Sequence, residues 1–208
     1  MNSAAESANP TATLNMANGK KIVIELLPES APNTVNSFIY VASLGLMDHH
    51  AIQRIVPGNW VDVSYTAFGK KEAQYLIPNE FELNPEVEPL DSHPGCVCMG
   101  GYGEAGLASC EFFFPLRDCP DHKGIYPVFG RVVEGMDEIY RLEKVKTKPV
   151  DFPIEGVEVN EPLEPEIIER VELQLHGKKY PEPVRVENPQ IPPCWKQDEN
   201  GTKIGDIF

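Results

Sequence analysis

A single arginine lies within a mainly apolar segment, and it is the residue best placed for chemistry. Arg54 belongs to residues 51–65, AIQRIVPGNWVDVSY, where apolar residues fall on both alternations around Pro57-Gly58. This mixed alternation predicts a strand packed on both faces, or two strands joined at that turn. Because arginine is rarely buried, Arg54 either points into a partly apolar groove or extends from a sheet edge to water. In a groove, its guanidinium would supply fixed hydrogen-bond donors.

Other patterns give weaker indications of chemistry. Residues 100–106, GGYGEAG, are glycine-rich, but they lack the arrangement of a phosphate-binding loop and have acidic neighbours, so a surface loop is favoured. Cys96 and Cys98 with His93 do not have the spacing of a usual zinc site. The histidine pair at 49–50 has no HExxH-like spacing of a metal-dependent hydrolase. We therefore expect neither a metal nor a cofactor.

The composition is that of one globular domain with extensions. The chain has 208 residues, 41% of them hydrophobic and 24% charged, which is enough for a sizeable core. The net charge of -14 and the absence of a clustered basic surface argue against nucleic-acid binding and against anionic membranes. No apolar run approaches the roughly 18 residues that a membrane span needs. The N-terminal residues lack a signal-peptide pattern, so a cytoplasmic location is expected.

Five cysteines, an odd number in a chain with a proper core, indicate free thiols rather than a disulfide scaffold. Their positions are Cys96, Cys98, Cys110, Cys119 and Cys194.

The elements that must position Arg54 are mostly short strands. Asn18-Gly19 predicts a hairpin between strands at 11–16 and 21–27, and a helix follows from about Pro32 until Gly45 ends it. Further strands are expected at 80–83, 96–99, 110–116, 126–133 and 167–175, with a second helix at 137–145. In CEFFFPL (110–116), at least one phenylalanine must face away from its neighbours, because side chains alternate along a strand.

This order predicts a mainly β, antiparallel fold, in which closure into a barrel would remove exposed edges. Residues 149–166 and the segment from 180 onward are rich in proline and polar residues. We expect a flexible N-terminus at 1–10, one domain at 11–183, a solvated loop at 149–166 and a C-terminal tail at 184–208.

Several segments, in this order, resemble the cyclophilin family. They are IELLPESAPNTVNSFIYVASLG, QRIVPG, NEF, CEFF and VFGRVVEGMDEI, and the match covers roughly residues 10–183. The late PEIIERVELQLHGKKYPEP is similar to the last strand and tail of bacterial cyclophilins. The resemblance implies a closed eight-stranded antiparallel barrel capped by two helices. It also implies peptidyl-prolyl cis–trans isomerase activity on proline-containing peptides or unfolded chains.

By this resemblance, Arg54 is the catalytic arginine and Phe113 is the floor of the proline pocket. The other substrate-binding positions depart from the family's usual residues; they are Asn59, Trp60, Asp62, Gly100, Gly101, Glu111, His122 and Tyr126. Trp60, in place of a methionine, would either fill the pocket or compensate for the aromatic wall that Asn59 replaces.

The two acidic replacements leave the function open between two classes. A close pair of Arg54 with Asp62 or with Glu111 would either occupy the donors that a prolyl amide needs or aim the guanidinium. The alternative function is a non-catalytic peptide-binding or scaffold protein that uses the same groove. The sequence does not fix the oligomeric state. It also leaves open whether Trp195 and Phe208 in the tail dock on the barrel or on another subunit.

Overall fold

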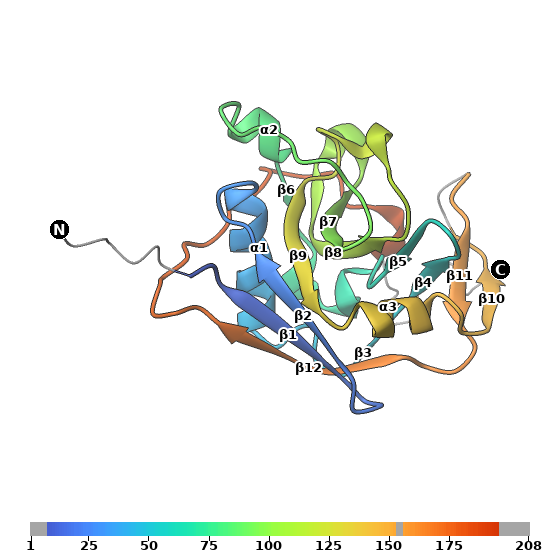
Figure 1. Cartoon of the computed structure of the whole chain (residues 1–208). Coiled ribbons are helices and arrows are strands. Elements are labelled where there is room, and N and C mark those ends of the chain that lie inside the picture. The colour runs from blue at the N-terminus through green and yellow to red at the C-terminus, as the bar shows by residue number, and fades with distance from the viewer. Residues whose placement is uncertain (1–7, 153–155, 196–208) are drawn as a thin grey trace.

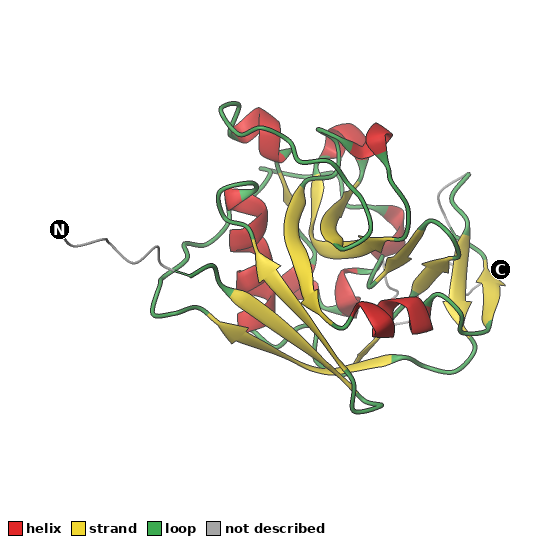
Figure 2. Ribbon diagram, in the orientation of Figure 1, coloured by secondary structure: helices red, strands yellow, loops and turns green. Residues whose placement is uncertain are grey.

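A curled antiparallel sheet with helices at its sides forms the body of the protein (Figures 1 and 2). The computed structural model describes residues 8–152 and 156–195. The helices are α1 (Pro32–Ser43), α2 (Glu80–Leu83) and α3 (Met136–Leu142), with short 3-10 helices at Ala67–Gly69, Lys71–Ala73, Gly103–Ala105, Pro120–His122 and Pro193–Trp195. Within the described ranges, none of the helices is long and apolar enough to cross a bilayer.

The main sheet has ten strands, and a separate hairpin has two. The strands are β1 (Thr11–Met16), β2 (Lys21–Leu26), β3 (His50–Ala51), β4 (Arg54–Val56), β5 (Trp60–Asp62), β6 (Leu76–Ile77), β7 (Cys96–Gly101), β8 (Leu107–Pro115), β9 (Val128–Glu134), β10 (Thr147–Val150), β11 (Val159–Pro162) and β12 (Ile167–Gln174). The order across the main sheet is β3-β12-β1-β2-β9-β7-β8-β5-β4, with β6 paired to β8. Strands β10 and β11 form the hairpin.

The two ends of this order are neighbours along the chain. Only Ile52 and Gln53 separate β3, which pairs with β12, from β4, which pairs with β5. The sheet therefore curls back on itself (Figure 2). The predicted mainly β, antiparallel class is confirmed. The finer expectation differs, because the described residues form a ten-stranded curled sheet rather than a closed barrel of eight strands.

The hydrophobic alternation in the sequence explains the core. Alternate residues of β1 and β2 are buried, and Gly19 turns the hairpin between them with a positive φ of 81°. Along β8, Phe112 and Phe114 pack in the main core, whereas Phe113 packs in a second cluster with Trp60 and Tyr126. The prediction that one phenylalanine faces away from its neighbours is confirmed, and the ring of Phe113 lies outside the main core.

Helix α1 is capped by a residue distant in sequence. Its N-cap residue, Ala31, provides no side-chain hydrogen bond. Instead, the fully buried Glu80 carboxylate accepts from the backbone N–H groups of Asn33 (3.2 Å) and Thr34 (2.7 Å), and from Thr34 Oγ1 (2.6 Å). A carboxylate at a helix N-terminus accepts from N–H groups that have no partner within the helix. Its negative charge also interacts favourably with the positive end of the helix dipole.

Two sequence-based predictions of secondary structure are wrong. Residues 80–83 form helix α2 rather than a strand, because the Asn79 side chain accepts from Phe81 N (2.9 Å) and Glu80 turns towards α1. The expected loop at 149–166 contains most of the β10–β11 hairpin. The predicted helices at about 32–45 and 137–145 correspond to α1 and α3. The expectations for residues 1–7 and for Phe208 lie outside the described residues.

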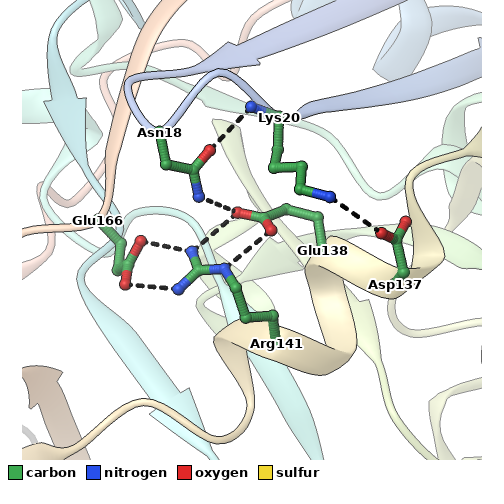
Figure 3. Close-up of polar contacts among 6 residues, drawn as sticks. All are labelled: Asn18, Lys20, Asp137, Glu138, Arg141 and Glu166. Atoms are coloured by element: carbon green, nitrogen blue, oxygen red, sulfur yellow. Dashed lines mark hydrogen bonds and ion pairs between the residues drawn. The ribbon is translucent and has the colours of Figure 1, made fainter.

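An arginine on α3 joins three parts of the fold (Figure 3). Arg141 donates to both carboxylate oxygens of Glu138, at 2.8 Å each, and to both of Glu166, at 2.9 and 2.5 Å. Asn18, in the β1–β2 turn, donates to Glu138 at 2.8 Å. The guanidinium therefore holds two carboxylates together, one of which is almost completely buried.

We expect Arg141→Leu to lower the free energy of unfolding by more than the roughly 1 kcal/mol of an exposed ion pair. Because Arg141 is partly exposed, the loss should stay below the roughly 3–5 kcal/mol of a fully buried broken pair. Urea denaturation measures the change. Arg170→Leu is the control, since the Arg170–Glu172 pair is exposed, and it should alter stability by no more than about 0.5 kcal/mol. Equal effects of the two variants would contradict the role given to Arg141.

Candidate active site

A pocket of about 550 Å³ opens beside β4, β5 and β8, and Arg54 lies on its wall. We call it the Arg54 pocket. Of the residues that the sequence singles out, those lining it are Arg54, Trp60, Asp62, Gly100, Gly101, Glu111, Phe113, His122 and Tyr126. The structure thus brings nine of the ten predicted site residues to one cavity.

Asn59 is the exception. It follows the Pro57-Gly58 turn, and its side chain accepts from Arg117 Nε at 2.8 Å. Neither Asn59 nor Arg117 lines the pocket. The position therefore contributes no wall to the cavity.

Arg54 is held by two hydrogen bonds from different nitrogens of its guanidinium. Arg54 and Asp62 face each other across the β4–β5 pair, and Nη1 donates to Asp62 Oδ2 at 2.6 Å. Nε donates to the Glu158 backbone carbonyl at 2.6 Å. Among the described residues, Nη2 has no hydrogen-bond partner. The Asp62 contact is therefore made through one nitrogen and leaves donors available, which favours an aiming role over a blocking one.

The electrostatics of this pair balance burial against attraction. The Arg54 and Asp62 side chains are only 15% and 17% exposed. Burial raises the pKa of the Asp62 carboxyl, and the Arg54 charge opposes that shift. The Arg54 guanidinium carbon also lies 5.4 Å from the centroid of the Trp60 ring, a distance at which a cation is attracted to the ring face.

Next to the arginine, four rings form an aromatic cluster. Phe113 lies edge-on to Trp60 (6.3 Å between centroids), His122 (5.6 Å) and Tyr126 (5.9 Å). His122 also contacts Trp60 (5.8 Å) and Tyr126 (4.9 Å). Burial lowers the pKa of His122, which favours the neutral ring. All four rings line the open pocket, so Trp60 forms a wall beside Phe113.

Glu111 does not pair with Arg54. Its Oε1 accepts from Ala67 N (2.7 Å) and from Trp195 Nε1 (2.7 Å), and its Oε2 accepts from the Tyr102 hydroxyl (2.5 Å). Burial raises the pKa of Glu111 to about 7, although these three hydrogen bonds act in the opposite direction. The possible Arg54–Glu111 pair is therefore replaced by a bond to the C-terminal tail.

The two glycines at the end of β7 allow a close approach of strands. A Cβ on Gly100 would lie 2.7 Å from the Glu111 backbone oxygen, and one on Gly101 would lie 3.0 Å from Leu107 Cδ2. Larger residues at these positions would displace β8, the strand that carries Glu111 and Phe113.

The structure adds pocket residues that sequence reasoning missed. They are Ser64, Tyr65, Tyr102, Ala105, Phe152, Val157, Gln190, Ile191, Pro192 and Pro193. Those from 152 onward follow α3, in segments expected to be a solvated loop and a tail. Their proline and aromatic content was the available signal, but it did not reveal where they pack.

The pocket offers hydrogen-bond donors and apolar walls. In the described ranges there is no group of three or more His, Cys, Asp or Glu side chains arranged to hold a metal ion. All five cysteines are free and buried. Such a site can polarise or orient a bound amide by hydrogen bonding while apolar walls exclude water.

Comparison with known proteins defines the class. Residues 11–164 match the family described as cyclophilin type peptidyl-prolyl cis-trans isomerase/CLD. The chain belongs to this family.

Relatives and solved structures agree with this assignment. Peptidyl-prolyl cis-trans isomerase CYP18-2 of Arabidopsis thaliana is 30% identical over 162 residues, which are 76% of this chain and 96% of that protein. Peptidyl-prolyl cis-trans isomerase-like 1 of Gibberella zeae is 30% identical, over 66% of this chain and 85% of that protein. By contrast, the chain spans 22% of the length of CYP71 of Arabidopsis thaliana, to which it is 30% identical over 66% of its own length.

A cyclophilin-type isomerase of Cryptosporidium parvum, crystallised in the presence of the dipeptide Ala-Pro, has a similar fold. Its TM-score is 0.60 at 18% identity, and the match covers 79% of this chain and 98% of that one. The plant and fungal relatives do not support the predicted bacterial likeness of the last strand and tail, which stays a prediction.

Proposed function

We propose that this protein catalyses the cis–trans isomerisation of X-Pro bonds in peptides or unfolded chains, with Arg54 as the catalytic residue. Family membership supports the reaction class and the proline-containing substrate. The observation that carries the assignment of Arg54 is its place on the wall of the pocket that Phe113 lines, with Nη2 not engaged by any described residue.

The chemistry needs no nucleophile. Resonance in the peptide bond creates a barrier of roughly 18–20 kcal/mol to rotation. In the twisted transition state this resonance is lost, and the imide nitrogen becomes a hydrogen-bond acceptor. A guanidinium already aimed by Asp62 and the Glu158 carbonyl would donate to that nitrogen, while the aromatic cluster around Phe113 holds the proline ring. Binding the twisted amide better than the planar one accelerates rotation.

The non-catalytic peptide-binding alternative is not favoured. It rests on the replaced pocket residues Asn59, Trp60, Asp62, Glu111 and Tyr126. Trp60 lines an open cavity, Asp62 engages one nitrogen of Arg54, and Glu111 bonds elsewhere. None of the three replacements removes both the cation and the apolar wall from the pocket.

A two-dimensional NMR exchange measurement on a short X-Pro peptide tests the proposal. Uncatalysed exchange takes tens to hundreds of seconds, so cross-peaks between cis and trans forms at sub-second mixing times should appear only when the protein is added. A protease-coupled assay gives the corresponding rate. If folded protein produces no exchange above background for any peptide in a set with varied X, the chain is not an isomerase.

A further inference from the structure

The C-terminal segment after β12 folds back over the body of the protein (Figure 1). Val184 and the Asn33 side chain of α1 exchange two hydrogen bonds, at 2.7 and 3.1 Å. Val186 N donates to Leu76 O in β6 at 2.9 Å. Between them, the Arg185 guanidinium carbon lies 4.1 Å from the centroid of the Tyr75 ring. The segment is thus fixed along its path from α1 to β6.

The described end of this segment is anchored beside the Arg54 pocket. Trp195 is 1% exposed, its Nε1 donates to Glu111, and its backbone carbonyl accepts from Gln74 Nε2 at 2.8 Å. The indole lies edge-on to the Tyr102 ring with centroids 5.5 Å apart. A buried tryptophan whose N–H has a hydrogen-bond partner anchors this part of the tail.

The residues just before the anchor form part of the pocket wall. Gln190, Ile191, Pro192 and Pro193 line the same cavity as Arg54. The same cavity is also lined by the apolar or aromatic residues Tyr65, Tyr102, Phe152 and Val157. The wall of the pocket therefore includes residues of the tail as well as the aromatic cluster around Phe113.

We propose that residues 190–193 form the wall of a second peptide subsite, which binds an apolar side chain flanking the substrate proline, and that Glu111 and Trp195 are positioning residues that hold this wall. The inference rests on the proposed function, because the occupant is an X-Pro peptide already bound at Arg54. The wall lines the pocket and leaves it open, and this favours a specificity role over a segment that fills the site.

The occupant should be apolar because three of the four wall residues, Ile191, Pro192 and Pro193, are apolar. Ile191, Pro192 and Phe152 offer hydrocarbon surface and no charge. Hydrophobic pockets discriminate between side chains of different size by about 10–200-fold. Since residues 190–193 form only part of the lining of this pocket, we expect a preference near the lower limit.

The experiment compares peptides that differ at one position. Dissociation constants are measured by NMR titration for X-Pro peptides with Leu or Gly at each position flanking the proline in turn, and exchange rates are recorded on the same samples. At one position the Leu peptide should bind about tenfold tighter than the Gly peptide. In the full-length Trp195→Ala protein that ratio should fall below about threefold. The ratio is internal to each sample, so a variant that only loses folded protein leaves it unchanged.

Two further variants separate positioning from general damage. Glu111→Gln keeps an oxygen that accepts from Trp195 Nε1 and should keep most of the preference, whereas Glu111→Ala should lose it. Glu187→Ala changes an exposed residue of the same segment and should behave as wild type.

Each outcome decides the proposal. An absence of preference in the wild type, a ratio unchanged by Trp195→Ala, or tighter binding of all peptides when the tail is released overturns it; the last result would make the tail an inhibitory cover. A preference lost in Trp195→Ala but without catalysed exchange supports the subsite and removes the isomerase function. Catalysed exchange without any preference supports the isomerase function and removes the subsite.

Discussion

Arg54→Ala should lower kcat/KM for a short X-Pro peptide by about 100-fold or more, the usual effect of removing a donor aimed at a transition state. The variant removes the one cation that lines the pocket among the described residues. The aromatic walls remain, so peptide binding should weaken less than turnover. NMR exchange gives the rate, and titration of the same peptide gives the dissociation constant.

Arg54→Lys separates charge from geometry. A lysine keeps the positive charge beside Asp62, but its compact ammonium cannot reproduce a planar fork that contacts Asp62, Glu158 and a substrate together. We expect this variant to remain well below wild type in rate while stability is retained better than in Arg54→Ala. Arg117→Ala is the matched control, because Arg117 bonds Asn59 outside the pocket. A rate within about threefold of wild type for Arg54→Ala would refute its catalytic role.

The second large effect concerns stability. We expect Glu80→Ala to lower the free energy of unfolding by about 3–5 kcal/mol, because it leaves buried donors unsatisfied at the start of α1. The carboxylate accepts hydrogen bonds from two backbone N–H groups of α1, from the Thr34 hydroxyl and from the Asn84 side-chain amide. Urea or thermal unfolding measures the loss.

Glu82→Ala provides the comparison within the same helix. Glu82 is exposed, so its removal should change stability by no more than about 0.5 kcal/mol. Similar effects of the two substitutions would mean that α1 does not depend on the distant carboxylate.

Local patterns were sufficient where a residue's neighbours in sequence decide its structure. The Asn18-Gly19 turn and the alternation in β1 and β2 predicted the hairpin. The alternation along β8 predicted that one phenylalanine leaves the main core, although the resemblance was needed to identify it as Phe113. The mixed alternation around Arg54 predicted either one strand packed on both faces or two strands joined at Pro57-Gly58, and the structure has two strands, β4 and β5.

Contacts between distant segments were not readable in the same way. Glu80 has two backbone N–H partners 46 and 47 residues away on α1, and the choice of helix over strand at 80–83 depends partly on them. A pair of Arg54 with Glu111 was one of two possibilities; Glu111 lines the same pocket as Arg54, but its Oε1 accepts from an indole 84 residues further along the chain. The sequence left the docking of Trp195 open between the barrel and another subunit; in the structure, Trp195 contacts Glu111 and Tyr102 of the same chain.

The pairing of the first strand with the last sets a constraint on biosynthesis. β1 lies between β2 and β12, with Thr11 opposite Gln174. At translation rates of about 5–20 residues per second, the outer edge of β1 waits on the order of ten seconds or more for its partner. During that interval the nascent chain exposes an unpaired strand edge, the kind of surface that recruits other chains or holding factors. The sheet is therefore completed late in synthesis, after nearly all of the domain has left the ribosome.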